Sequence, residues 1–114
     1  VLPNSLTEIS DYLFSDCTSL SDILIPASVT EIETGAFQRC TSLLSIVIPD
    51  SVTEIEDIAF SQCSALRSVL LPASVTEIGV GAFDKCPNLT LTVFRNSYAE
   101  RYAQRNHIPY TYAD

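Results

Sequence analysis

"SVTEI" stands at residues 28–32, 51–55 and 74–78 of the chain, and a near copy, "SLTEI", stands at residues 5–9. A catalytic site is assembled once from unlike residues, whereas repetition at a fixed spacing indicates architecture. Each copy begins 23 residues after the one before it. Four prolines and four cysteines keep the same spacing: Pro3, Pro26, Pro49 and Pro72, and Cys17, Cys40, Cys63 and Cys86. The sequence therefore predicts a repeat architecture with a period of 23 residues.

The period divides the chain into four turns and a tail. The turns are residues 3–25, 26–48, 49–71 and 72–94, and residues 95–114 leave the repeat. Eight columns are identical in all four turns: Pro, Ser, Thr, Glu, Ile, Phe, Cys and Leu. A chain of 114 residues is long enough for one domain with a modest core. We predict a single domain of four turns and a C-terminal cap.

Each turn contains an apolar segment with Leu-x-x-Ile-x-Ile spacing, as at Leu43, Ile46 and Ile48. The last two positions alternate as in a strand with one buried face, and the proline that follows stops the strand. This spacing at a short fixed period is typical of a leucine-rich-repeat solenoid. The predicted fold class is therefore an α/β solenoid with one short parallel strand per turn. A short helical or 3₁₀ stretch is expected at the phenylalanine of each turn, with the rings stacked in the core.

Within the pentapeptide, the two apolar side chains are expected to face the core. Val29 and Ile32 bracket Thr30 and Glu31, which we expect to face water. Ser28 follows the proline by two residues, and we expect its hydroxyl to form a local hydrogen bond that fixes the turn. The pentapeptide is therefore interpreted as a wall of the solenoid rather than a recognition code.

The tail has the pattern of a helix followed by a strand. Ser97 with Glu100 three residues later is a capping-box pattern, and Asn106 before Ile108 suits a helix end. We predict a helix from about residue 98 to 105 and a short strand at residues 110–112.

No comparable segment covers the N-terminal end, because residues 1–3 align with residues 24–26 and so begin at the end of a strand. We therefore expect the chain to be the C-terminal piece of a longer solenoid. The open end, with its strand edges and Phe14, is expected to self-associate.

The charge is unevenly distributed along the chain. The net charge is −8, of which residues 1–94 contribute −9 and residues 95–114 contribute +1. An acidic body without a basic stripe would repel a phosphate backbone, which argues against nucleic acid as a partner. No apolar run approaches the roughly 20 residues that span a bilayer, so we expect no membrane insertion.

The four cysteines raise the question of a disulfide or a metal site. Zinc needs ligands that converge on one point, whereas these cysteines occur once per turn in a straight column. Adjacent members lie within disulfide range by the strand spacing, but their side chains run parallel instead of facing each other. We expect four reduced thiols that are buried as small hydrophobic side chains.

One glutamate in each turn belongs to an acidic column: Glu8, Glu31, Glu54 and Glu77. The middle turns add Glu33, Glu56 and Asp57 to this column. Calcium needs about six to eight oxygens around one centre, which a straight column does not supply, so a solvated face is favoured over a cation site. Repeated carboxylates in equal environments also make no acid–base pair. His107 is the single histidine and falls at the predicted helix end. We predict no enzyme activity, no metal and no cofactor.

The unit Leu-x-x-Ile-x-Ile-Pro-x-Ser-Val-Thr-x-Ile-x-x-x-Ala-Phe-x-x-Cys resembles the BspA-like leucine-rich-repeat family, found mainly in bacterial surface proteins. The resemblance covers residues 1–94, and "SYAERYAQRNHIPY" at residues 97–110 looks like the C-terminal ending of that family. It implies a location outside the cell or on the bacterial surface, with an export signal upstream of these residues. It also implies, for some members, adhesion to extracellular-matrix proteins such as fibronectin or fibrinogen.

The strand face that points away from the core is the most informative surface. Its predicted columns are Leu24, Val47 and Leu70; beside them Asp22, Ser45 and Ser68; and further out Ser21, Leu44, Arg67 and Thr90. Solenoids use such a sheet as an extended binding surface, although apolar residues also suit a parallel ladder on its open face. We predict a non-enzymatic binding or adhesion module that engages a protein or glycan partner through this face. The alternative is a structural spacer or cap of a longer repeat protein, without a ligand site of its own.

Overall fold

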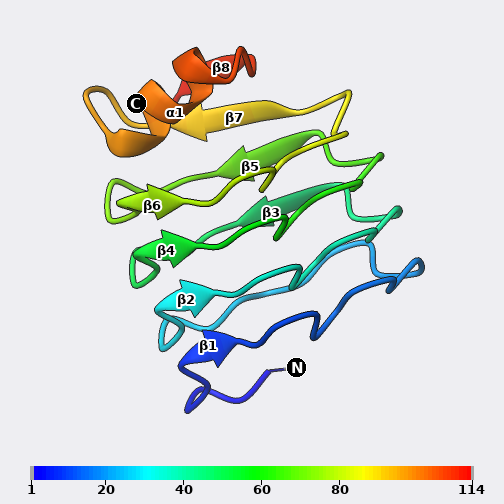
Figure 1. Ribbon diagram of the computed structural model, residues 1–114. Helices are drawn as coiled ribbons and strands as arrows, with labels where there is room; N and C mark the ends of the chain where they lie inside the picture. Colours follow the sequence, from blue (N-terminus) through cyan, green and yellow to red (C-terminus); the bar gives the residue numbers. More distant parts are fainter. Residues whose placement is uncertain (1, 114) are drawn as a thin grey trace.

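The computed structural model describes residues 2–113 and is a β-solenoid whose short parallel strands recur one period apart (Figure 1). The elements in order are β1 Glu8–Ile9, β2 Glu31–Ile32, β3 Ser45–Val47, β4 Glu54–Ile55, β5 Ser68–Leu70, β6 Glu77–Ile78, β7 Thr90–Val93, α1 Tyr98–Arg105 and β8 Tyr110–Tyr112. Val1, on which the expected strand end at the N-terminus partly rests, lies outside the described residues.

The strands form two parallel sheets. Sheet A has the order β1-β2-β4-β6 and sheet B the order β3-β5-β7-β8. Parallel strands at the repeat spacing are thus confirmed, but each middle turn contributes two strands rather than the one that was predicted. The second strand is the Glu-Ile pair of the pentapeptide, which is too short to leave an alternating pattern in the sequence. In the first turn, residues 20–25 form no strand, although Leu44 N–H donates to Ser21 O at 3.2 Å.

The pentapeptide forms the wall that the sequence predicted. Val29 and Ile32 are fully buried, whereas Thr30 is exposed. The Thr30 hydroxyl donates to the carbonyl oxygen of Thr7 in the preceding turn at 3.2 Å, and the same bond recurs from Thr53 and Thr76. The repeated threonine therefore links neighbouring turns.

The serine two residues after the proline also forms a hydrogen bond to a neighbouring turn. Ser28 Oγ donates to Leu6 O at 2.5 Å, and Ser74 Oγ donates to Val52 O at 2.8 Å. The prediction of a local hydrogen bond is therefore wrong, because the hydroxyl points along the solenoid axis and donates to a carbonyl oxygen of the preceding turn. Ser51 Oγ has no such partner among the described residues.

A column of stacked aromatic rings fills one side of the core. Phe14, Phe37, Phe60 and Phe83 lie with successive ring centroids 5.3, 5.1 and 5.2 Å apart. The stretch around each ring consists of turns with hydrogen bonds between residues three apart rather than a continuous helix. Because every ring is packed against the next turn, the core depends on the repeat being kept in register.

The cysteine column lies beside these rings. All four thiols are free; Cys40 and Cys63 are buried as predicted, whereas Cys17 and Cys86 are only half-buried. Each of the last three donates to the phenylalanine carbonyl of the preceding turn, as Cys63 Sγ does to Phe37 O at 3.1 Å. Burial raises the pKa of Cys40 to about 11 and that of Cys63 to about 12.

The tail closes the C-terminal end as predicted, with the helix at residues 98–105 and the strand at 110–112. Ser97 Oγ accepts a hydrogen bond from Glu100 N–H at 3.1 Å, while the Glu100 carboxylate accepts from Asn96 N–H at 2.8 Å. Tyr102 meets the ring of Phe83 edge-on at 6.2 Å. No helix in the described part of the chain is long and apolar enough to cross a membrane.

The helix ends in a Schellman motif. Ile108 N–H donates to Ala103 O at 3.0 Å and His107 N–H donates to Gln104 O at 3.4 Å. His107 occupies the left-handed position of this motif, with φ of 56°, where glycine is preferred. The single histidine therefore lies at a helix end, exposed, and not in a cleft.

The burial of the thiols predicts their reactivity. In native protein, a thiol reagent such as DTNB should label Cys17 and Cys86 at most, because Cys40 and Cys63 are inaccessible and hold little thiolate. After unfolding in guanidinium chloride all four should react. Rapid labelling of all four thiols in native buffer would contradict this core.

The helix end predicts a stabilising substitution. His107→Gly should raise the free energy of unfolding by about 1 kcal/mol, because glycine adopts the left-handed backbone without a steric penalty. Gln104→Gly, inside α1, is the matched control and should lower it by about 1 kcal/mol. Urea denaturation measures both, and an unchanged or lower midpoint for His107→Gly would refute the assignment.

Candidate functional site

The outward face of sheet B presents an aligned apolar column. In the sheet register, Val47 pairs with Leu70, and Leu24 precedes Val47 by one period. Ile46 and Val69, which lie beside them in the strands, are buried, so the column side chains point outward. Leu24 is 86% exposed and Val47 is 61% exposed, while Leu70 is half-buried. The structure therefore brings the three predicted apolar residues together on one face.

Polar residues flank this column as predicted. Ser45 pairs with Ser68 in the register, and both are exposed, as is Asp22. Leu44 is 48% exposed and Arg67 is exposed, at the N-terminal ends of strands β3 and β5. These eight predicted residues are therefore accessible or half-accessible: Asp22, Leu24, Leu44, Ser45, Val47, Arg67, Ser68 and Leu70. Ser21, in the outer predicted column, is exposed as well.

The prediction for one outer column is wrong in the last turn. Thr90 pairs with Ser68, 22 residues earlier, and therefore leaves the column of Leu44 and Arg67 in which the sequence period had put it. The turn is one residue short because Leu91 and Val93 alternate into the core immediately after Leu89.

The corrected register adds two residues to the face. Thr92 pairs with Leu70, and Thr111 of β8 pairs with Thr92, so both continue the apolar column. The signal that could have found them is the alternation of apolar and threonine residues in β7 and β8. We call the eight predicted residues together with Thr90, Thr92 and Thr111 the sheet B face.

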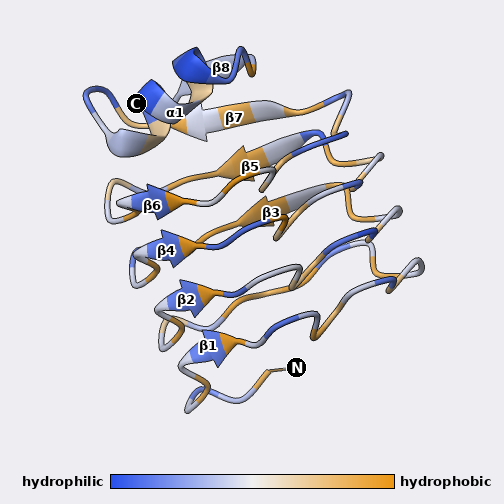
Figure 2. Cartoon of the chain, viewed as in Figure 1, coloured by the Kyte–Doolittle hydropathy of each residue, from blue (hydrophilic) through white to orange (hydrophobic). Residues whose placement is uncertain are grey.

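Hydroxyls and aliphatic groups dominate the sheet B face. Its charged members are Asp22 and Arg67, and it contains no aromatic ring among its named residues. The strands of sheet A, in contrast, carry a glutamate in every turn, which Figure 2 shows as hydrophilic segments opposite the hydrophobic β3 and β5. The two sheets of one solenoid thus have very different electrostatic character.

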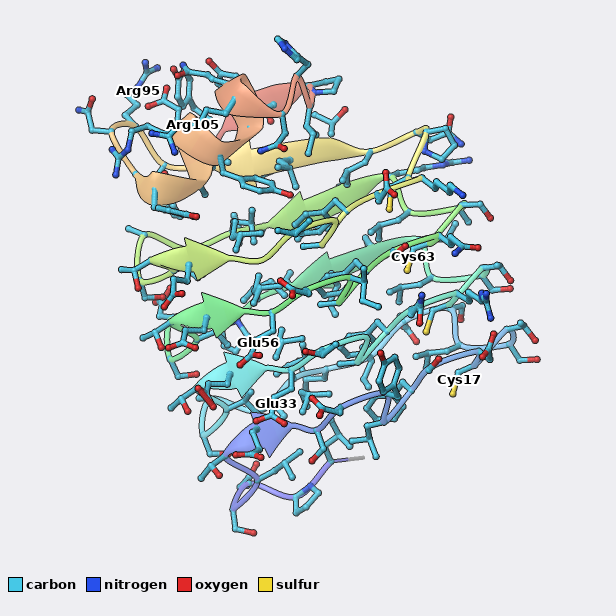
Figure 3. The ribbon with its side chains drawn as sticks, in the orientation of Figure 1. Cys17, Glu33, Glu56, Cys63, Arg95 and Arg105 are labelled. Atoms are coloured by element: carbon cyan, nitrogen blue, oxygen red, sulfur yellow. The ribbon has the colours of Figure 1, made fainter. Side chains whose placement is uncertain are left out.

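The glutamates of sheet A lie in register across all four of its strands. Glu33 and Glu56 lie just after two of these strands, on the same side of the molecule (Figure 3). Carboxylate oxygens of Glu8, Glu31 and Glu33 lie within 4.8 Å of one another, as do those of Glu31, Glu54 and Glu56. Glu33 and Glu56, which the sequence places beside the column on the middle turns, therefore complete these two clusters.

This crowding changes the acidity of the carboxyl groups. Partial desolvation, followed by the negative charges of Glu77 and Glu31, raises the pKa of Glu54 above its ordinary value. The pKa of Glu56 is raised by desolvation and then by Glu31. One ligand oxygen from each of three carboxylates is fewer than the about six to eight that calcium prefers, and exposed acidic groups are common without an ion, so the geometry supports electrostatic repulsion rather than a metal assignment.

The repeat matches a known family over nearly its whole length. The model of the BspA type leucine rich repeat region matches residues 1–106 in six copies. The chain belongs to the BspA-type leucine-rich repeat family. Its fold is that of a protein-interaction or structural repeat module, in a family whose members are generally non-enzymatic.

Solved leucine-rich repeat structures are similar to this BspA-type chain. A leucine-rich repeat protein from Bacteroides ovatus is 30% identical, with a TM-score of 0.81 over 95% of this chain and 28% of that one. A leucine rich cell surface protein from Faecalibacterium prausnitzii is 31% identical, with a TM-score of 0.63 over 90% of this chain and 33% of that one.

A leucine rich repeat protein from T. pallidum is 33% identical, with a TM-score of 0.59 over 76% of this chain and 52% of that one. The BspA-type chain thus spans between about a quarter and about half of the length of these structures. No curated protein matches it.

The acidic column predicts an unusual pH dependence. Because the folded-state pKa values of Glu33, Glu54 and Glu56 are raised, these groups take up protons on folding, and stability should rise as the pH falls from 7 towards about 5. At lower pH the stability should fall again, because the pKa of Glu100 is lowered, mainly by the hydrogen bond that its carboxylate accepts from Tyr112.

Glu54→Gln tests this account through the urea midpoint. The substitution should raise the midpoint at pH 7 and flatten its rise on acidification, because one member of the column is already neutral. Asp50→Asn removes the same charge from the turn after Pro49 and is the matched control. A midpoint that falls steadily from pH 7 to about 5 would contradict the repulsion.

Proposed function

We propose that this BspA-type repeat is a non-enzymatic binding module of a bacterial cell-surface protein, and that it engages a protein or glycan partner through the sheet B face. The observation that carries the proposal is the apolar column of Leu24, Val47 and Leu70, in which Val47 pairs with Leu70 in the sheet register and both Leu24 and Val47 are exposed. Aligned apolar side chains that remain in water favour a contact that removes them from it.

The composition of the face supports a specific contact. Serine and threonine hydroxyls flank the apolar column and can donate and accept hydrogen bonds, so a partner can satisfy polar groups while it covers Leu24 and Val47. The face is nearly neutral, whereas sheet A is acidic, so a partner meets little repulsion on the sheet B side. The parallel ladder holds these side chains at fixed spacing, which limits the entropy lost on binding.

Surface location is supported by the relatives. One of the similar structures is described as a leucine rich cell surface protein. The free thiols are compatible with such a location, because those of Cys40 and Cys63 are buried and protected from oxidants.

Joint replacement of Leu24, Val47 and Leu70 by serine tests the proposal. Surface plasmon resonance with immobilised fibronectin and fibrinogen, together with a glycan array, should show saturable binding by the unchanged chain. The triple variant should bind at least about tenfold more weakly, since each lost aliphatic contact costs on the order of 1 kcal/mol. Far-UV circular dichroism verifies that the variant folds.

A matched control removes exposed apolar groups elsewhere. Leu13 and Val80 are 48% and 83% exposed and lie outside sheet B, so Leu13→Ser with Val80→Ser should leave binding unchanged. Equal losses in both variants would refute the assignment to the sheet B face. Absence of saturable binding by the unchanged chain would instead favour the role of a structural spacer or cap.

A further inference from the structure

The side-chain bonds between neighbouring turns are not the same at every junction. Those of threonine and cysteine join each turn to the next, including the second turn (residues 26–48) to the third (residues 49–71). The serine bonds occur only at alternate junctions. Ser28 and Ser74 donate to the turns before them, whereas Ser51 Oγ, the equivalent atom of the third turn, is buried without a partner in the described chain. We call the junction between the second and third turns the central junction.

An aspartate column follows the same alternation. Asp11 Oδ1 accepts from Thr34 N–H at 3.1 Å, and Asp57 Oδ1 accepts from Val80 N–H at 2.9 Å. These bonds join the first turn to the second and the third turn to the fourth. At the central junction the column supplies Thr34 in place of an aspartate, and the N–H of Asp57 has no partner among the described residues.

A third position shows the pattern again. Ser42 Oγ donates to Thr18 O at 2.6 Å, and Asn88 Nδ2 donates to Ser64 O at 3.4 Å. The equivalent residue of the third turn is Ala65, whose side chain cannot donate a hydrogen bond. Three separate columns therefore lose their bond at the same junction.

Side-chain packing over the backbone alternates in the same way. Residues 12, 35, 58 and 81 all have a left-handed backbone, with φ between 51° and 69°. Glycine occupies this column in the second and fourth turns, where a Cβ would meet the Tyr12 ring or, at 3.3 Å, Cγ2 of Ile58. This backbone is strained for a β-branched residue such as Ile58. Tyr12 and Ile58 thus cover the glycines that follow them, whereas Gly35 has no side chain with which to cover Ile58.

The four alternating contacts divide the repeat into two modules of two turns, residues 3–48 and 49–94. The strand pairing, the phenylalanine stack and the threonine and cysteine bonds continue across the central junction, but nothing in the four alternating columns strengthens it. The stability of a solenoid is approximately a sum over its turns and junctions, so the least bonded junction opens first. We propose that each two-turn module is a cooperative unit and that the central junction is a built-in opening point between them.

A module that has separated cannot remain folded alone. Two turns are fewer than the three or so that a repeat protein needs to bury a continuous core. The second module keeps its cap, in which Tyr102 contacts the ring of Phe83 and Tyr98 Oη accepts from Ile78 N–H at 3.3 Å. Opening at the central junction therefore unfolds both turns of the first module together while the second module and α1 stay folded.

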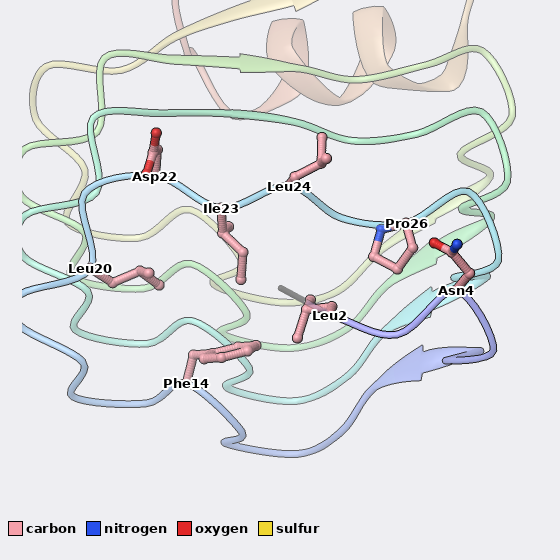
Figure 4. A pocket seen from close by; sticks show the side chains of 8 residues that line it. All are labelled: Leu2, Asn4, Phe14, Leu20, Asp22, Ile23, Leu24 and Pro26. Atoms are coloured by element: carbon pink, nitrogen blue, oxygen red, sulfur yellow. The ribbon is translucent and has the colours of Figure 1, made fainter.

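The central junction lies within the sheet B face. Val47 of the first module pairs with Leu70 of the second, and Leu24 lies one period before Val47 in the first module. Figure 4 shows Leu24 and Asp22 directed away from Ile23 of the same segment, which places their side chains on the outward side. Movement at the junction changes the separation of Val47 and Leu70. The opening point is thus located where it can alter the shape of this face, although the opening itself does not depend on a partner.

Native-state hydrogen exchange, followed by NMR, tests the modules. Glu33, Glu56 and Gly79 occupy one column, and each N–H donates to an isoleucine carbonyl of the preceding turn, at 2.9, 2.8 and 2.8 Å. The N–H groups of Glu33 and Glu56 become exposed together when the first module opens, so their protection factors should agree within about threefold. That of Gly79 should be at least about tenfold higher. Three stepwise values, or one value for all three groups, would overturn the proposal.

Two substitutions at the central junction test the coupling in opposite directions. Ala65→Ser supplies the missing donor next to Thr41 O and should slow the exchange of Glu33 and Glu56 together, about two- to tenfold. Thr53→Val removes the bond to Thr30 O and should accelerate both by a similar factor. Ala65 and Thr53 lie in the third turn, so turn-by-turn fraying would leave Glu33 unchanged in both variants, and that result would refute the opening point.

Asn88→Ala is the matched control, because it removes the equivalent bond inside the second module. It should accelerate the exchange of Gly79 and leave Glu33 and Glu56 unchanged, since the second module stays folded while the first opens. Equal acceleration of all three groups would show a single cooperative unit and contradict the proposal. None of the substituted residues belongs to the sheet B face, so this result is independent of partner binding.

Discussion

The hydrogen bonds between successive turns are the constraint on which the rest of this structure depends. Each turn is too small to bury its own apolar face, so it is stable only when the next turn stacks on it in register. The bond from Thr53 N–H to Thr30 O, at 2.9 Å, and the sulfur contact from Cys63 to Phe37 O recur with the period of the chain. Threonine, phenylalanine and cysteine, three of the identical columns of the sequence, supply side-chain contacts that keep this register.

Stacking in register multiplies unfavourable contacts as well as favourable ones. The phenylalanine and isoleucine columns gain from it because like apolar side chains pack together. The same stacking destabilises the glutamate column through charge repulsion, because Glu31 faces Glu8 on one side and Glu54 on the other. Sheet B avoids this repulsion by carrying serine, threonine and aliphatic residues outward. The repeat therefore gives sheet B an almost uncharged outer face and sheet A an acidic one.

Much of this architecture could be predicted from the sequence, because a repeated residue reports its environment several times. The period, the buried Val29 and Ile32, the phenylalanine stack and the helix bounds all follow from spacing and side-chain type. The strand at Glu31–Ile32 could not be predicted, since two residues are too few to show a periodicity. The hydroxyl of Ser28 could not be placed either, because its acceptor, Leu6 O, lies 22 residues away in the sequence.

The arrangement of the candidate face was predicted correctly in its main columns and incorrectly where the repeat loses a residue. Leu24, Val47 and Leu70 share one face because their spacing is constant. Thr92 and Thr111 join that face only after the last turn shortens, and a strict period assigns their neighbours to the wrong column. The place of Glu33 beside the acidic column was predicted from the sequence, whereas its distance from Glu8 depends on side-chain direction, which spacing does not give.

The thiol contacts described above carry a consequence for biogenesis. In the folded chain, the thiols of Cys40, Cys63 and Cys86 each donate a hydrogen bond to a phenylalanine carbonyl. A disulfide in this column would break those hydrogen bonds. An unfolded chain, in contrast, presents four accessible thiols at once. In an oxidising compartment, folding therefore competes with disulfide formation, and a chain that stacks its turns quickly escapes covalent misfolding. In such a compartment, the cysteine column would therefore make the yield of native protein depend on the speed of folding as well as on stability.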